Sequence, residues 1–98
     1  MYLKIHDNQN GKIVAVCDED LIGKVLEDEG KYMDLDKYRN FYIGEKSSEE
    51  KVKVALKSFG SVNIVGKKSV KIATDMKLVS KDEVMYINRV PYIQIYKL

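Results

Sequence analysis

Residues 2–17 have the sequence YLKIHDNQNGKIVAVC, and this stretch decides the first element of the fold. Apolar and polar side chains alternate over residues 2–7, and a second apolar run covers residues 13–17. The turn signal NQNG separates the two runs, so the stretch predicts a β-hairpin. Pairing Asp7 with Lys12 brings four aliphatic side chains onto one face, as a sheet packed on a core requires. In this register the opposed pairs are Leu3 with Val16, Ile5 with Val14, Tyr2 with Cys17, and His6 with Ile13.

The segment after the hairpin is less regular. The acids at 18–20 suit the first turn of a short helix, because carboxylates there accept free N–H groups and oppose the helix dipole. We expect Gly23 to end that turn. Two short strands, at 25–26 and 32–35, fit around an acidic turn. Residues 38–44 hold three aromatic side chains and predict a packed loop.

An amphipathic helix is predicted after Ser47. Ser47 and Glu50 have the spacing of a capping box. Apolar residues then recur at helical spacing until Gly60, which we expect to end the helix. The inner side of this helix is predicted to hold Val52, Ala55, Leu56 and Phe59.

A second helix is predicted to begin at Gly66 and to extend to about Lys77. Its buried side would hold Val70, Ala73 and Met76, with Ile72 near the edge. The four residues at 62–65, VNIV, predict a buried strand or a tight connection between the two helices.

The C-terminal residues predict another hairpin, with strands at 85–87 and 91–98 around Asn88-Arg89-Val90. Pro91 lacks an N–H group and therefore belongs at a strand start or an edge. Ser80 with Glu83 caps one more turn. The order of strands, helices and strands predicts a single α+β domain over residues 1–98. Its small mixed or antiparallel sheet has N- and C-terminal hairpins, with two helices packed on one face.

Composition excludes several classes of function. The chain has one cysteine, Cys17, and one histidine, His6, which is too few for a structural zinc site or a disulfide framework. No apolar run is long enough to span a membrane, and the N-terminus lacks the features of a secretory signal. We therefore expect a cytoplasmic protein without a cofactor. The chain has few residues suited to base-specific recognition of nucleic acid, since only Arg39 and Arg89 are arginine.

Charge is divided unevenly along the chain, although the net charge is only +2. Residues 1–30 hold three lysines and seven acids, whereas the remaining 68 residues hold 14 basic and eight acidic residues. Between Lys51 and Lys77, seven lysines accompany one acid, Asp75. This basic region is the first place to look for a polyanionic partner.

The sharpest local motif is VGKKSVKI at 65–72, in which a strand or turn enters a helix through Gly66. Free N–H groups and the dipole at such a helix start favour an anion. The predicted phosphate or RNA site therefore consists of Gly66, Lys67, Lys68 and Lys71, joined by Lys51, Lys53 and Lys57 on the outer side of the first helix. The alternative is a well-packed helix start with solvated lysines.

Tyrosine is abundant, with seven in the chain. The predicted strands place Tyr2, Tyr86, Tyr92 and Tyr96 largely opposite the aliphatic positions. Such a face can stack bases, form a homodimer or other protein interface, or pack under residues 24–44 as a second small core.

Catalytic groups do not converge in the predicted fold. Cys17 and His6 lie about 13 Å apart along the hairpin at 3.3 Å per residue, beyond the reach of a nucleophile and its base. Three consecutive acids at 18–20 lack the alternate spacing of a calcium loop. No catalytic or metal-binding residue is therefore assigned, and an enzyme is the third hypothesis.

The segments MYLKIH, VAVCDEDLIGK, FYIGEKSSEE, VNIVGKKSVKIA and RVPYIQIYKL follow one another along the chain. Together they resemble a small archaeal family known as domain of unknown function 424. The resemblance covers essentially the whole chain, and VAVCDEDLIGK and NIVGKKSVKIA are its most specific parts. It implies an archaeal origin, one α+β domain and a link to translation or RNA metabolism.

Three hypotheses of function follow. The leading one is a non-enzymatic protein that binds RNA or a ribonucleoprotein through the lysine-rich helical surface. The second is a protein-interaction module or homodimer that uses the tyrosine face. The third is an enzyme with an unidentified substrate.

Overall fold

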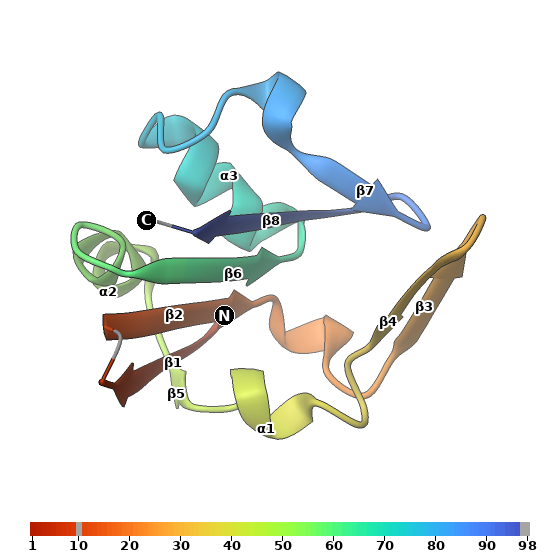
Figure 1. Ribbon diagram of the computed structural model, residues 1–98, viewed down its shortest axis with the longest axis horizontal. Helices are drawn as coiled ribbons and strands as arrows, with labels where there is room; N and C mark the ends of the chain where they lie inside the picture. The colour runs from red at the N-terminus through yellow and green to blue at the C-terminus, as the bar shows by residue number, and fades with distance from the viewer. Residues whose placement is uncertain (10, 97–98) are drawn as a thin grey trace.

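A computed structural model describes residues 1–9 and 11–96. Its frame is a six-stranded mixed sheet in the order β5-β1-β2-β6-β8-β7 (Figure 1). Neighbouring strands are antiparallel except β2 and β6, which run parallel. The strands are β1 (Tyr2–Asn8), β2 (Gly11–Cys17), β5 (Glu45–Lys46), β6 (Ser61–Val65), β7 (Met85–Ile87) and β8 (Val90–Tyr96).

The N-terminal hairpin has the predicted register. Asp7 pairs with Lys12, and Leu3 lies opposite Val16. Leu3, Val14 and Val16 are buried, while Ile5, nearer the tip, is exposed. Because side chains alternate between faces, this register sends the aliphatic set of both strands toward one core.

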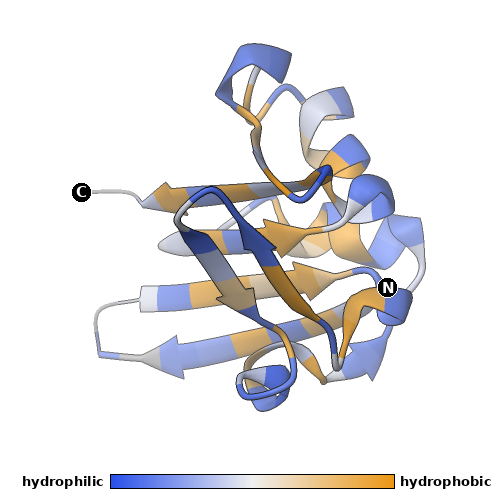
Figure 2. Ribbon diagram, turned by 90° about the vertical axis from the view of Figure 1, so that its right-hand side faces the viewer, coloured by the Kyte–Doolittle hydropathy of each residue, from blue (hydrophilic) through white to orange (hydrophobic). Residues whose placement is uncertain are grey.

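Two helices cover one face of the sheet, as predicted: α2 (Glu49–Ala55) and α3 (Lys67–Asp75). Between them and the strands lies an apolar core. In Figure 2 the apolar residues run mainly along the strands of the sheet. The fully buried members of this core include Val14, Val16, Val52, Leu56, Val62, Ile64, Ile72 and Ile93.

Helix α2 begins one residue later than predicted. Ser48, not Ser47, is its N-cap and accepts a hydrogen bond from the Lys51 N–H at 3.3 Å. The Ser47 N–H instead donates to the Met1 carbonyl at 2.9 Å, continuing the β5 edge of the sheet. Pairing with β1 therefore keeps the chain extended through Ser47.

Helix α2 is shorter than predicted, since its C-cap is Leu56, well before Gly60. Helix α3 has its N-cap at Gly66 and its C-cap at Met76, close to the predicted bounds. Ile72, expected near the edge of the second helix, is 2 % exposed and belongs to the core.

The second face of the sheet is covered by the segment between β2 and β5. It contains the short 3-10 helix η1 (Glu19–Leu21), a two-stranded sheet and helix α1 (Arg39–Tyr42). The predicted pair of short strands is confirmed as β3 (Val25–Asp28) and β4 (Lys31–Asp34). The second apolar cluster under this cover includes Ala15, Cys17, Leu21, Leu26, Leu35, Tyr42, Val65 and Ile87.

The tips of two hairpins touch. Glu29 and Gly30 in the β3–β4 turn have positive φ, as do Asn88 and Arg89 in the β7–β8 turn. The two turns lie side by side (Figure 1), and the Asn88 N–H donates to the Asp28 carboxylate at 3.0 Å. This contact fixes the outer end of the β3–β4 hairpin against the edge of the main sheet.

None of the helices within residues 1–9 and 11–96 has the length and apolar character that crossing a membrane requires.

Candidate functional site

The start of α3 is capped from inside the protein. Asp18 is 6 % exposed, and its carboxylate accepts hydrogen bonds from the N–H groups of Lys68 at 3.1 Å and Ser69 at 2.9 Å. The Ser69 hydroxyl donates to the same carboxylate at 2.6 Å. When a carboxylate already accepts hydrogen bonds from the first N–H groups of a helix, a second anion is bound only weakly there. The predicted anion site at these N–H groups is therefore filled by Asp18.

Gly66 has a structural reason to be glycine. Its φ is 111°, and a Cβ there would lie 2.3 Å from Cγ of Asp18. The Gly66 N–H also donates to the Pro91 carbonyl at 2.9 Å, and the Asp18 N–H donates to the Val65 carbonyl at 3.1 Å. Because Gly66 has no side chain, the start of α3 can lie close to Asp18. The role of Gly66 is therefore this close packing and not the binding of an anion.

Asp18 itself does not do what its sequence context predicts. Its side chain makes no capping hydrogen bond to η1, the turn that directly follows it. The acids at 18–20 therefore divide: Asp18 caps a distant helix, while Glu19 and Asp20 are exposed. The N-terminal ammonium group beside Glu19 lowers the pKa of that carboxyl group.

The lysines predicted to form one basic patch separate into two sets. On α2, Lys51 pairs with Glu45 at 2.6 Å, and Lys53 lies 3.7–3.8 Å from Glu49 and Glu50. These two charges are balanced by their neighbours. The other predicted lysines, all exposed, are Lys57 after α2 and Lys67, Lys68 and Lys71 on α3.

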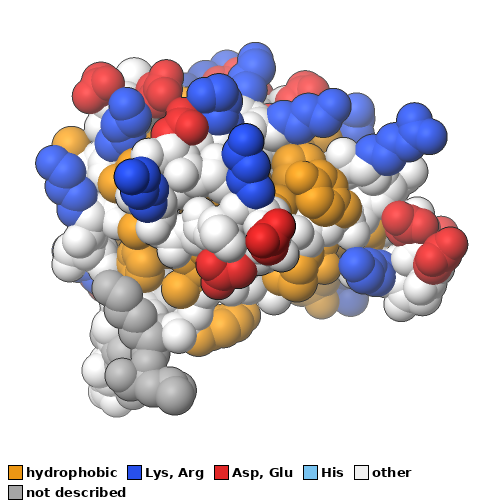
Figure 3. Space-filling view, turned by 90° about the horizontal axis from the view of Figure 1, so that it is seen from above, with side chains coloured by type: hydrophobic (Ala, Val, Ile, Leu, Met, Phe, Trp, Pro, Cys, Tyr) orange, Lys and Arg blue, Asp and Glu red, His pale blue; other side chains and the backbone are white. Residues whose placement is uncertain are grey.

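A groove of about 340 Å³ lies between α3 and the segment that leads into β7. Three lysines border it: Lys67 and Lys71 from α3, and Lys81 from the 3-10 helix η2 (Lys81–Glu83). Figure 3 shows this side of the molecule, where exposed apolar surface lies among basic and acidic side chains. The remaining lining residues are Val70, Thr74, Val84, Tyr86 and Pro91, so none of the described residues that line the groove is acidic.

Local structure explains how these side chains meet. Lys67, Lys71 and Thr74 are spaced i, i+4 and i+7, which places them on one face of α3. Lys81 is the first residue after the N-cap Ser80, within the predicted capping box of Ser80 and Glu83, which is present. The groove thus joins a helix face to a capped turn.

The ammonium groups at the groove differ in their partners. Lys71 donates to Asp75 at 2.8 Å, and this hydrogen bond raises the pKa of Lys71. Lys67 and Lys81 form no ion pair with any residue in 1–9 or 11–96. Two unpaired cations and one paired cation are therefore available to a ligand. Lys81 was missed from the sequence because it lies outside both predicted helices.

The four tyrosines do not share one face, which corrects the predicted arrangement. The β7–β8 turn contains only Asn88 and Arg89, so Tyr86 pairs with Pro91, and Met85 pairs with Tyr92. Tyr86 therefore lies on the opposite side of the sheet from Tyr92. It is 55 % exposed and lines the groove beside α3.

The other three tyrosines are separated along the second face. Tyr2 and Tyr92 are half-buried at either side of the second core, in a row with Cys17 and Val65. Tyr96 is exposed at the far end of β8. The continuous aromatic face that the interface hypothesis requires is not formed.

Cys17 and His6 are apart, as the predicted register implies. Cys17 is fully buried, and burial raises the pKa of its thiol to about 12. The His6 ring stacks on Phe41 at 4.6 Å, with its Nε2 2.9 Å from the Phe41 carbonyl oxygen. A buried, protonated thiol is not a nucleophile. Within residues 1–9 and 11–96, no three side chains are grouped as metal ligands.

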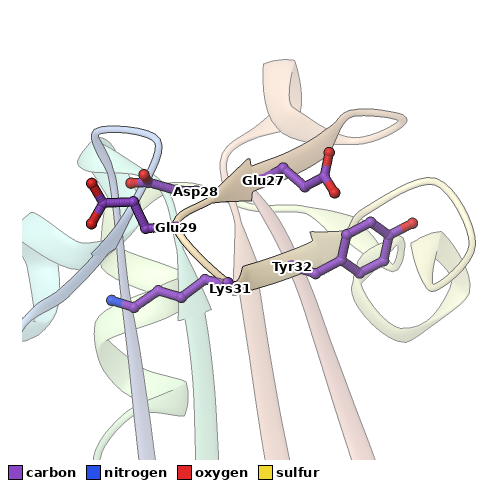
Figure 4. Close-up of a pocket in the computed structure, with 6 residues that line it drawn as sticks. Glu27, Asp28, Glu29, Lys31 and Tyr32 are labelled. Carbon is purple, nitrogen blue, oxygen red and sulfur yellow. The ribbon is translucent and has the colours of Figure 1, made fainter.

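A second hollow of about 310 Å³ lies along the β3–β4 hairpin (Figure 4). Its side chains diverge: Glu27 and Tyr32 lie toward one side of the ribbon, and Glu29 and Lys31 toward the other. Asp28 is already engaged by Asn88. The side chains of this hollow do not converge on a common point, so the groove beside α3 is the better candidate site.

Comparisons with known proteins place the chain among proteins without an assigned activity. The crystal structure of an uncharacterized conserved protein from Methanopyrus kandleri has a similar fold, with a TM-score of 0.79 and 26 % identity. The similarity covers 97 % of this chain and 89 % of that one. No curated protein matches the chain. The model of the family described as protein of unknown function (DUF424) matches residues 5–98, and the chain belongs to that family.

Proposed function

We propose that this protein is a non-enzymatic RNA-binding protein, acting on RNA or a ribonucleoprotein, and that it contacts the RNA through the groove beside α3. One observation carries the proposal. Three lysines from two separate elements border a single groove, and no acidic residue is among the lining residues that the structure describes. A concave surface of this polarity attracts a polyanion.

The residue types indicate the mode of binding. Lysine ammonium groups on flexible stems neutralise phosphates as point charges, and they do not read bases in the bidentate way of arginine. The chain has 17 basic residues, but only Arg39 and Arg89 are arginine. The proposed contact is therefore with the sugar-phosphate backbone and is largely independent of sequence.

The proposal narrows the lysine surface predicted from the sequence. Lys67 and Lys71 remain in it, and Lys81 joins them. Lys68 lies in an adjacent hollow with Met1, Glu49 and Lys71, so Lys71 borders both hollows and the second one contains an acidic side chain. The α2 lysines Lys51 and Lys53 are balanced by glutamates, so we expect them to contribute little.

The test is fluorescence anisotropy with a labelled RNA of about 12 nucleotides in roughly 50 mM salt. The double variant Lys67→Glu/Lys81→Glu is expected to bind at least about tenfold more weakly, because it replaces two cations at the groove with anions. The matched control is Lys12→Glu/Lys37→Glu, which changes the net charge equally. Both control residues are exposed and lie outside the groove lining.

The two possible failures are distinct. Wild-type protein that shows no affinity for RNA at low salt would overturn the proposed function. Equal loss of binding in the groove variant and the control would show that net charge alone acts, and the groove would then have no special role.

We also infer an archaeal origin and a cytoplasmic location. The first is supported by the similarity to the protein from Methanopyrus kandleri. The second is supported by the cysteine usage, since the single thiol is buried and unpaired, as is usual in a reducing compartment.

A further inference from the structure

Tyr86 lies at the edge of the groove, on strand β7. Its backbone is paired with Pro91 in the β7–β8 hairpin, and its carbonyl oxygen accepts a hydrogen bond from Lys31 Nζ at 3.1 Å. The β3–β4 hairpin therefore supports β7 from the side away from β8. More than half of Tyr86 is nonetheless exposed, at 55 %. A large aromatic side chain held this way is available to a flat ligand.

Three lysines line the same groove as this ring. Lys67 and Lys71 are one turn of α3 apart, about 6 Å along the helix axis at 1.5 Å per residue. Lys81 and Tyr86 line the same groove from the neighbouring segment. The site thus combines an aromatic platform with ammonium groups on two sides, which is the combination that single-strand binding proteins use.

We propose that the ligand of this groove is single-stranded RNA, with one base stacked on the Tyr86 ring and the adjoining phosphates bound by Lys67, Lys71 and Lys81. This inference rests on the proposed function and adds the strandedness of the RNA. Base faces inside a duplex are stacked on one another, so a duplex offers Tyr86 no free face except at its ends. A groove of about 340 Å³ is also in the size range of a small-molecule site, which suits a nucleotide rather than a helix.

The absence of tryptophan from the chain makes the inference directly measurable. Tyr86→Trp places a single indole in the groove and keeps an aromatic platform. The matched control is Tyr96→Trp, because Tyr96 is also exposed, at 66 %. It lies five residues beyond Pro91 along β8, roughly 16 Å away at 3.3 Å per residue. The two variants therefore report on similar exposure at different places.

Single-stranded RNA is expected to quench the fluorescence of Tyr86→Trp, because a stacked base quenches indole emission. The Tyr96→Trp variant should change little in the same titration. A duplex of the same sequence, with blunt ends and at the same nucleotide concentration, should leave both variants nearly unchanged.

Affinity measurements give a second readout. Tyr86→Leu keeps apolar bulk against the groove but removes the ring, and its affinity for single-stranded RNA should fall by about 5- to 150-fold. Tyr86→Phe should bind within about twofold of wild type, since the ring is retained. If Tyr86→Leu does not fold, the fluorescence of Tyr86→Trp decides the matter.

The outcomes separate this inference from the proposed function. RNA binding that is weakened by Lys67→Glu/Lys81→Glu but gives no quenching of Tyr86→Trp would overturn base stacking and leave the groove as an RNA site. Equal quenching by duplex and single strand would overturn the preference for single strands. No binding of any RNA would overturn both proposals.

Discussion

Asp18 links the start of α3 to the sheet. Its carboxylate is buried and satisfies two helix N–H groups and the Ser69 hydroxyl, 50 or more residues away in the sequence. Hydrogen bonds to a charged acceptor are stronger than those between neutral groups. Asp18 thereby joins the end of β2 to the start of α3, the helix that carries Lys67 and Lys71.

Asp18→Ala should lower the free energy of unfolding by about 2–4 kcal/mol, because it removes a helix cap and leaves buried donors without an acceptor. Urea unfolding followed by circular dichroism measures the loss. Asp20→Ala is the control: Asp20 is exposed in the same turn, so its replacement should change stability by less than about 0.5 kcal/mol. Similar effects of the two substitutions would contradict the role given to Asp18.

The buried thiol of Cys17 makes stability depend on pH. Its pKa is raised from the ordinary 9.0 to about 12 in the folded protein, first by burial and then by the charge of Asp18. Between these values the unfolded chain loses a proton that the folded chain keeps, so stability must fall as pH rises. Below pH 9 the thiol is protonated in both states and the contribution is fully present.

The measurement compares wild type with Cys17→Ala across pH. The stability difference between them should narrow from about pH 9 upward, by at most about 1.4 kcal/mol per pH unit. Tyr42 is present in both proteins, so the effect of burial on its pKa cancels, and only the smaller effect of Cys17 on that pKa differs between them. A disulfide reagent should react with native Cys17 only as fast as the protein unfolds. A difference that stays constant through this range would contradict the raised pKa.

At the level of residues, the sequence indicated that Asp18 and the helix start at Gly66 are important, but it did not indicate that they contact each other. The acids at 18–20 and the helix start at Gly66 were both singled out as helix N-terminal features. Spacing along the chain cannot show that Asp18 caps the second helix instead of its own turn, since the contact spans β6 and the parallel pairing of β2 with β6. The anion expected at that helix start was in fact a side chain of the protein itself.

At the scale of elements, the hairpins were the most predictable. Period-two alternation and turn chemistry are local, and the full register of β1 with β2 follows from them. The predictions that were wrong concern positions set by contacts between distant parts of the chain. Helix α2 starts at Glu49 because β5 pairs with β1. Tyr86 lies on the opposite face of the sheet from the predicted one, because the β7–β8 turn has two residues instead of three. A one-residue difference in a turn moves each following side chain to the other side of the sheet.

The β3–β4 hairpin is held at its tip by few contacts, and this can be tested. Asp28→Ala removes the acceptor for the Asn88 N–H, so hydrogen exchange at the Asn88 amide should become faster. Global stability should fall by less than about 1.5 kcal/mol, since the contact is at the surface. Glu27→Ala is the control, because Glu27 is exposed on the same strand and is not bonded to the turn. Unchanged exchange at Asn88 in Asp28→Ala would show that other contacts hold the hairpin.

At the scale of the whole molecule, the fold places the acidic and the basic parts of the sequence on different surfaces. The acidic N-terminal third supplies the cover of the second face, including the hairpin tip with Glu27, Asp28 and Glu29. The basic C-terminal part supplies α3, η2 and β7 around the groove. The α2 lysines, which the same count included, are paired with glutamates. The number of lysines therefore overstates the basic surface. At the groove, Lys67 and Lys81 form no ion pair within residues 1–9 and 11–96, whereas Lys71 is paired with Asp75.

Salt dependence distinguishes a local site from a diffuse basic surface. For single strands, log K falls against log salt with a slope of about −0.7 per phosphate neutralised. Three groove lysines predict a slope near −2 when Lys71 exchanges Asp75 for a phosphate. A surface that used all seven lysines between Lys51 and Lys77 would give a slope near −5. Lys67→Glu/Lys81→Glu should bring the slope close to zero, while Lys51→Gln/Lys53→Gln should leave it near −2. The opposite result would be a steep slope that Lys51→Gln/Lys53→Gln reduces as much as Lys67→Glu/Lys81→Glu does. RNA binding would then belong to the helical surface as a whole, because each lysine would contribute equally.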